Sequence, residues 1–126
     1  MRAAADPRRR LDRHPELELI LCHSGSLLPQ LIGRIDYQFE LLVTGSEAKR
    51  APSESIRLLY TDAVCAWPPA LANALAFFGD SRVMFGTDDP FWEPQRTLDC
   101  LEELPLSPER TVAIYEANAR RAFNLS

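Results

Sequence analysis

Short apolar runs alternate with longer amphipathic stretches along this chain. Runs at 17–22, around 58–62 and at 82–85 predict three β-strands, because each run is short and each is followed by turn-forming residues. Between the first two runs, apolar residues recur at three- and four-residue steps from Leu27 to Leu42, which predicts a helix with one buried face. This alternation of strands and helices is typical of an α/β protein with a parallel sheet.

Prolines and glycines delimit the other predicted elements. The remaining helices are expected near residues 7–13, 69–78 and 95–102 and from residue 108 onward, and three of them start at a proline. Gly79 is expected to end the helix that follows Pro68. Residues 44–55 are polar and contain both glycine and proline, so they are expected to form the longest loop. The expected total is three strands and four or five helices.

Composition narrows the class of protein. With 126 residues the chain is one ordinary domain with a single core, and its net charge of −4 gives no reason to expect a nucleic-acid partner. No stretch approaches the roughly 18 apolar residues that span a bilayer, and the first residues lack a secretory apolar run, so no membrane partner and a cytoplasmic location are expected. The widely spaced Cys22, Cys65 and Cys100 form no CxxC pair, so buried, reduced thiols are expected.

Two of the predicted strands end in residues that can carry chemistry. The third strand runs into a Gly-Thr-Asp-x-Pro turn that contains Asp88, and the first runs into a His-x-Gly turn that begins with His23. Ligands and metals gather at the C-terminal strand ends of parallel α/β proteins, so these two residues are the candidate catalytic residues. Either could instead cap the following turn or helix. Asp62, which ends the middle strand, is expected to be a cap or to support the residues around it.

Four segments stand in the same order and spacing as in one known family. They are residues 14–25 with Pro29 and Arg34-Ile35 after them, residues 59–62, residues 78–90 and residues 114–123. Together they resemble the C-terminal part of the amidohydrolase-related metalloenzymes, the group that includes aminocarboxymuconate-semialdehyde decarboxylase. The resemblance implies an α/β fold that is a partial (β/α)8 TIM barrel, with residues 1–126 as a single domain that holds the last three strands and their flanking helices.

The resemblance also implies a chemistry. In that family a divalent metal, zinc or manganese, lies at the C-terminal rim of the barrel, and the Asp that lies beside or binds the metal corresponds to Asp88. The His after the sixth strand corresponds to His23, so His23 and Asp88 are expected to move protons or to stabilise developing charge. The implied reaction is hydrolysis or decarboxylation, and the implied substrate is a small carboxylated or amide-bearing molecule.

Three further residues are candidates for substrate binding. Arg34, in the helix after His23, is expected either to face a substrate carboxylate or to form a surface salt bridge. Phe91 and Trp92 directly follow the Asp88 turn, so they are expected either to form an apolar wall at the barrel mouth or to pack in the core.

The departures from the family concern the metal above all. The family's metal needs a His-x-His pair on the first strand and another His on the fifth, whereas this chain has only two histidines, and a whole barrel takes about 250 residues. A catalytic zinc takes three protein ligands, and Asp88 is the only credible one here. Ser26 also stands where the family often has a second glycine.

Two hypotheses of different classes follow from these observations. In the first, the chain is part of a metal-dependent hydrolase or decarboxylase and is inactive when isolated, because another chain must supply the missing strands and ligands. In the second, it is a truncated, non-catalytic α/β domain that self-associates. Three strands of an open barrel leave two edges and an apolar inner face uncovered, so a homo-oligomer is expected in either case.

Overall fold

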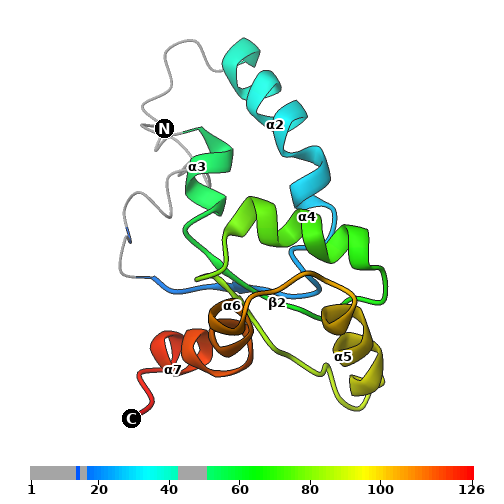
Figure 1. Cartoon of the computed structure of the whole chain (residues 1–126). Helices are drawn as coiled ribbons and strands as arrows, with labels where there is room; N and C mark the ends of the chain where they lie inside the picture. Colours follow the sequence, from blue (N-terminus) through cyan, green and yellow to red (C-terminus); the bar gives the residue numbers. More distant parts are fainter. Residues whose placement is uncertain (1–13, 15–16, 43–50) are drawn as a thin grey trace.

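The computed structural model describes residue 14, residues 17–42 and residues 51–126. In chain order the elements are β1 (Ile20–Leu21), α2 (Leu28–Leu42), α3 (Pro52–Ile56), β2 (Tyr60–Asp62), α4 (Pro68–Phe78), β3 (Val83–Met84), α5 (Pro94–Glu102), α6 (Pro108–Val112), the π-helix η2 (Ala113–Ala117) and α7 (Asn118–Ala122) (Figure 1). The helix expected near residues 7–13 lies outside the described residues. Within the described ranges, no helix combines the length and the apolar character that crossing a bilayer would need.

The three strands form one parallel sheet in the order β1-β2-β3, as the sequence predicts. The register places Ile20 beside Tyr60, Leu21 beside Thr61, Thr61 beside Val83 and Asp62 beside Met84. Each strand is shorter than its apolar run. The first strand ends at Leu21 because a sharp turn follows, in which the residues from His23 onward have positive φ.

Helix α4 supplies half of the buried core cluster. It starts at Pro68, ends at Gly79 as predicted, and the glycine has the positive φ of 82° that side chains rarely adopt. The side chains that α4 buries are Leu71, Ala74, Leu75, Phe77 and Phe78. They pack with Val83 of β3 and with buried residues of the C-terminal helices, among them Leu101 and Ile114. The core therefore lies between β3, α4, α5 and η2.

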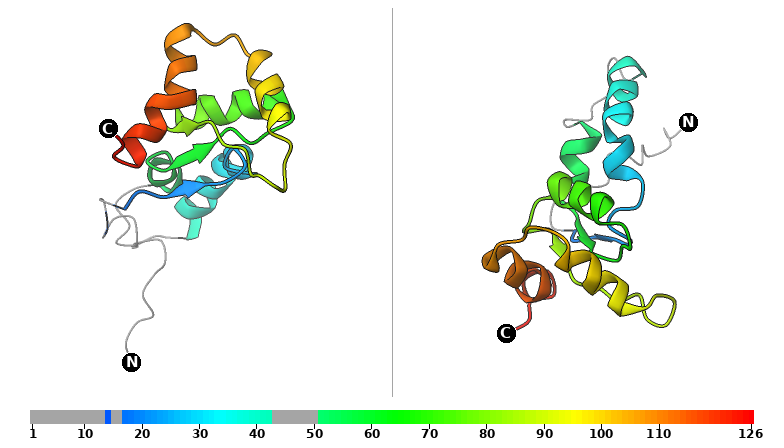
Figure 2. Two further views of the ribbon diagram at one scale, coloured as in Figure 1. Left: turned by 90° about the horizontal axis from the view of Figure 1, so that it is seen from below. Right: turned by 45° about the vertical axis from the view of Figure 1, so that its right-hand side comes forward.

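Helix α2 forms where the sequence predicts it, but its buried face is smaller than expected. Leu27 and Leu31, which the periodicity assigns to the buried face, are 68% and 46% exposed. Ile32 is partly buried against the core. Figures 1 and 2 show the reason, because α2 projects away from the sheet and lies beside α3 and one end of α4.

Two other expectations need correction. Residues 52–55, expected to belong to a loop, form α3, because Pro52 occupies the first helical position and the Asp36 carboxylate accepts a hydrogen bond from the Ser53 N–H at 2.9 Å. The rest of that expected loop, up to residue 50, lies outside the described residues. The cysteines are free thiols, but only Cys100 is buried, whereas Cys22 is exposed because it follows the last paired residue of β1.

The C-terminal helical segment contains a π-turn that contacts β3. Within η2 the Asn118 N–H donates to the Ala113 carbonyl, five residues back, rather than to the Ile114 carbonyl. The Ile114 carbonyl instead accepts the Phe85 N–H at 2.7 Å, directly after β3. The Tyr115 ring stacks on Phe85 with a centroid distance of 5.3 Å. The irregular turn thus ties the C-terminal helices to the strand that leads to Asp88.

Candidate active site

A left-handed turn follows β1 and presents His23. Four consecutive residues, His23, Ser24, Gly25 and Ser26, have positive φ values of 58°, 55°, 72° and 54°. The turn closes with a hydrogen bond from the Ser26 N–H to the His23 carbonyl at 2.7 Å. For residues other than glycine this conformation costs roughly 1–2 kcal/mol each, so the turn needs compensating contacts elsewhere.

Packing holds the buried side of this turn in place. A Cβ at Gly25 would lie 2.7 Å and 2.8 Å from two ring atoms of Phe78, so only glycine fits against the end of α4. Ser24 is also buried, and its hydroxyl donates to the Val64 carbonyl at 3.4 Å. The turn is thereby attached both to α4 and to the segment after β2.

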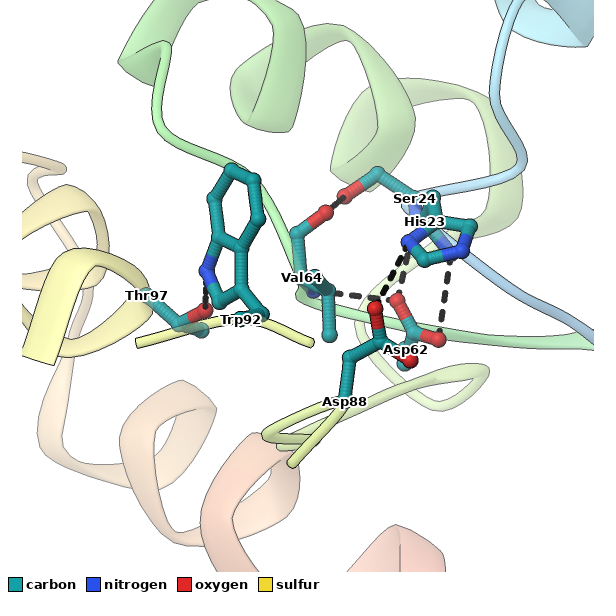
Figure 3. A network of polar contacts seen from close by, with 7 residues as sticks. All are labelled: His23, Ser24, Asp62, Val64, Asp88, Trp92 and Thr97. Atoms are coloured by element: carbon teal, nitrogen blue, oxygen red, sulfur yellow. Dashed lines mark hydrogen bonds and ion pairs between the residues drawn. The ribbon is translucent and has the colours of Figure 1, made fainter. Parts of the chain in front are cut away.

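The Asp62 carboxylate compensates the turn electrostatically. It accepts hydrogen bonds from the His23 N–H at 3.1 Å, the Ser24 N–H at 3.2 Å and the Val64 N–H at 3.0 Å (Figure 3). Successive backbone N–H groups that converge on one point form a nest that suits an anion. Hydrogen bonds to a charged group are worth roughly 1.5–3 kcal/mol each, enough to offset much of the strain. The expectation that Asp62 is a cap is confirmed.

His23 and Asp88 meet at the carboxyl ends of β1 and β3, across β2. The Nδ1 atom of His23 lies 4.0 Å from Oδ2 of Asp88, and their side chains are 53% and 36% exposed. Asp88 also has a positive φ, 51°, and its carbonyl accepts the N–H groups of Phe91 and Trp92 at 2.9 Å and 3.1 Å. Figure 3 shows the imidazole and the carboxylate facing each other. The structure therefore brings the two candidate catalytic residues together.

The three candidate substrate-binding residues differ in their placement, since Phe91 and Trp92 belong to the Asp88 turn and Arg34 lies in α2. Arg34 is exposed. It lies roughly 9 Å along α2 from Leu28, at 1.5 Å per residue, and therefore away from the turn that carries His23. Phe91 is 87% exposed, which excludes the core alternative for its side chain. Trp92 is half-buried, its Nε1–H donates to the buried Thr97 hydroxyl at 3.2 Å, and in Figure 3 it lies beyond Val64 from His23.

The described residues do not complete a metal site. Among residue 14, residues 17–42 and residues 51–126, no three His, Cys, Asp or Glu side chains are grouped so that they could hold an ion. A catalytic zinc needs three protein ligands, and manganese prefers still more oxygen donors, so Asp88 and a neighbouring imidazole are too few. The donor set in this part of the chain does not fit a resident divalent metal.

Asn118 supports the site in a way that the motif comparison did not identify. It is fully buried, and its amide donates to the carbonyls of Asp80 and Val83, at 2.6 Å each. These bonds fix the entry to β3, the strand that leads to Asp88. The signal that could have found it is an asparagine among the apolar residues of a helix, because a buried polar group has to be hydrogen-bonded.

Comparison with known proteins places this geometry in a family. The model of the family described as "Amidohydrolase" matches residues 6–125. Gamma-resorcylate decarboxylase of a Rhizobium species is 30% identical over 118 residues, which are 90% of this chain and 36% of the relative. The 2-amino-3-carboxymuconate-6-semialdehyde decarboxylase of Caenorhabditis elegans is 32% identical over 79 residues, which are 61% of this chain and 20% of the relative.

A solved structure agrees with these matches. The dihydroxybenzoic acid decarboxylase of a Polaromonas species, crystallised with manganese and the inhibitor 2-nitroresorcinol, superposes with a TM-score of 0.79 at 28% identity, over 91% of this chain and 36% of that one. The chain thus spans about a third of the length of the gamma-resorcylate decarboxylases that it matches. Its three parallel strands and flanking helices are part of a (β/α)8 barrel, and the chain belongs to the amidohydrolase family.

Proposed function

We propose that this chain carries the His23 and Asp88 part of a decarboxylase active site that acts on a small aromatic carboxylate. The observation that carries the proposal is the 4.0 Å separation of His23 Nδ1 and Asp88 Oδ2 at the strand ends where this family's chemistry takes place. The sequence left hydrolysis and decarboxylation open. The relatives favour decarboxylation, because those described above are decarboxylases of small carboxylic acids.

The pair has the chemistry that such a reaction needs. When an aromatic carboxylate loses CO2, the bond between the ring carbon and the carboxyl carbon breaks, and its electron pair stays on the ring carbon, which takes up a proton. A protonated His23 can donate that proton, and the Asp88 carboxylate lies beside its imidazole. Both side chains are exposed enough for a small molecule to reach them.

A divalent metal belongs to the proposal only through a further source of ligands. Because the described residues do not group three donors, the remaining ligands of a zinc or manganese ion would come from outside this part of the chain. An isolated monomer is therefore expected to be inactive. Residues 1–126 would act as the C-terminal portion of a barrel that becomes complete only in an assembly.

The test measures metal content and turnover of the full chain over a range of protein concentrations. The chain is offered Mn2+ or Zn2+, and 2,6-dihydroxybenzoate, which a structural neighbour binds, serves as the probe substrate. We expect near-stoichiometric metal and CO2 release only in the associated fraction. His23→Ala and Asp88→Asn should each lower turnover by about 100-fold or more, the usual contribution of a positioned proton donor.

Asp89→Asn is the matched control for this test. It makes the same chemical change one residue further along, at an exposed side chain, and should leave turnover unaltered. Absence of both metal and turnover at every protein concentration would contradict the proposal.

Exposed apolar side chains favour a second candidate, a non-catalytic domain that self-associates. Leu17, Leu19 and Ile20 around β1 are exposed, as are Leu27 and Leu31 at the start of α2. Association with a second copy would remove such apolar surface from water. This candidate predicts concentration-dependent association without metal or turnover. Sedimentation velocity in the presence and absence of Mn2+, combined with the activity assay, separates it from the decarboxylase.

A further inference from the structure

Asp62 binds the His23 turn and lies against the backbone segment that leads to Asp88. Each of its two carboxylate oxygens accepts a hydrogen bond from this turn. Oδ2 accepts the His23 N–H at 3.1 Å, and Oδ1 accepts the Ser24 N–H at 3.2 Å. Oδ1 also accepts the Val64 N–H at 3.0 Å, two residues along its own chain segment. The bond from Val64 restricts the rotation of the Asp62 carboxylate, so the orientation of the group that binds the His23 turn is fixed.

The other side of Asp62 faces the turn that carries Asp88. A Cβ at Gly86 would lie 3.0 Å from Cβ and 3.7 Å from Cγ of Asp62, so the backbone at Gly86 passes directly against this side chain. Asp88 follows two residues later, in a turn closed by the Phe91 and Trp92 N–H groups. Asp62 therefore sits between the His23 turn and the start of the Asp88 turn, in hydrogen-bond contact with one and in close packing with the other.

We propose that Asp62 is a positioning residue that sets the separation of the His23 imidazole and the Asp88 carboxylate. This inference rests on the proposed function, because it matters only if the pair acts as one proton-transferring unit. Asp62 does so without touching substrate, since its oxygens are taken up by three backbone N–H groups. Asp62 ends β2, which lies between β1 and β3, so its contacts fix the His23 and Asp88 side chains relative to each other.

The test is a double-mutant experiment on the full chain, read by NMR at one pH. The readout is the change in the His23 ring resonances that Asp88→Asn causes, first in the otherwise unchanged protein and then in Asp62→Ala and Asp62→Asn. The chain has only two histidines, so His14→Gln assigns the signals. We expect a clear response in the unchanged protein, its loss in Asp62→Ala and a weaker response in Asp62→Asn, which puts an amide N–H2 group toward the His23 N–H.

The matched control is Asp36→Ala. Asp36 also accepts a backbone N–H, that of Ser53 at 2.9 Å, but it does so between α2 and α3, away from the site. The His23 response to Asp88→Asn should remain intact in this variant. A general loss of stability would weaken the response in both alanine variants, so the comparison separates positioning from folding.

The outcomes distinguish failure of the proposed function from failure of the positioning role of Asp62 alone. If Asp88→Asn leaves the His23 resonances of the otherwise unchanged protein as they were, the two side chains do not act together and the proposed function fails. If the response exists but persists at full size in Asp62→Ala, only the positioning role is overturned. Should Asp62→Ala not fold, Asp62→Asn decides, because a full-size response there also overturns the role.

Discussion

Helices α2 and α4 follow neighbouring strands of one sheet, yet only α4 is buried. Helix α4 buries five side chains against β3, α5 and η2, whereas none of the described side chains of α2, at residues 28–41, is buried. The difference shows that position in the row of elements decides burial. Helix α4 has neighbours on both sides in the described chain, while α2 lies at the end of the row beside α3 (Figure 2). Stability should therefore decrease from β3 and α4 outward to α2.

The most severe test of this gradient is a pair of identical truncations. Leu71→Ala in α4 removes a fully buried side chain and should lower the free energy of unfolding by about 2–5 kcal/mol. Leu31→Ala in α2 removes one that is 46% exposed and should cost no more than about 0.5 kcal/mol. Urea denaturation followed by circular dichroism measures both. Equal costs would mean that α2 is covered in solution.

The contact between α4 and the turn that precedes α2 is tested by a change at Gly25. Gly25→Ala should destabilise the protein by about 1–3 kcal/mol, because its φ is 72° and the added Cβ would meet the Phe78 ring. Combining it with Phe78→Leu relieves the collision but not the backbone strain, so part of the penalty from Gly25→Ala should disappear in that background. Additive losses would show that the ring is not the obstacle.

A pH series compares the buried and exposed thiols. Burial raises the pKa of the Cys100 thiol from 9.0 to about 12, with a further contribution from the neighbouring Cys65 thiol. Between these values the unfolded chain releases the proton and the folded chain keeps it, so stability falls as pH rises, by up to about 1.4 kcal/mol per pH unit. Below pH 9.0 the contribution is fully present.

The slope of unfolding free energy against pH, measured above pH 9.0, should thus be shallower in Cys100→Ala than in the unchanged protein. Cys22→Ser, at an exposed thiol near α2, provides the comparison and should leave the slope as it is. Parallel slopes for all three proteins would show that Cys100 ionises as readily as an exposed thiol.

The smallest expected effect has the opposite sign. Gly33 lies within α2, and a Cβ there would meet no atom within 4 Å. Gly33→Ala should raise the free energy of unfolding by about 0.5–1 kcal/mol through helix propensity alone. Gly25→Ala is the same substitution eight residues away. In one series of urea curves, the two changes in the free energy of unfolding should have opposite signs. A loss of stability at Gly33 would indicate that another segment packs closely on α2.

Patterns local in the chain were sufficient to predict the framework. The apolar runs located all three strands and their parallel pairing, and the Pro68 start and Gly79 end of α4 were identified by backbone chemistry that depends on one residue. The strand-end argument also selected His23 and Asp88 as candidates, and the structure places them 4.0 Å apart because parallel strands bring their carboxyl ends to one edge.

Contacts between segments far apart in the sequence could not be predicted from these local patterns. The four left-handed residues at 23–26 include two serines, a residue type whose propensity does not indicate this conformation. It is stabilised by Asp62, nearly forty positions further along the chain, through hydrogen bonds that no pattern displays. Exposure of Leu27 and Leu31 likewise depends on which elements lie beside α2, and helical periodicity carries no information about neighbours.

The π-turn of η2 also limits how the sheet can grow. An edge strand with free N–H groups is a template for another strand, but at Phe85 the donor is already taken by the Ile114 carbonyl. A further strand at this edge, such as one that completes the barrel in an assembly, would have to displace that carbonyl and the Tyr115 ring stacked on Phe85. Completion of the barrel at β3 therefore requires η2 to give up this contact.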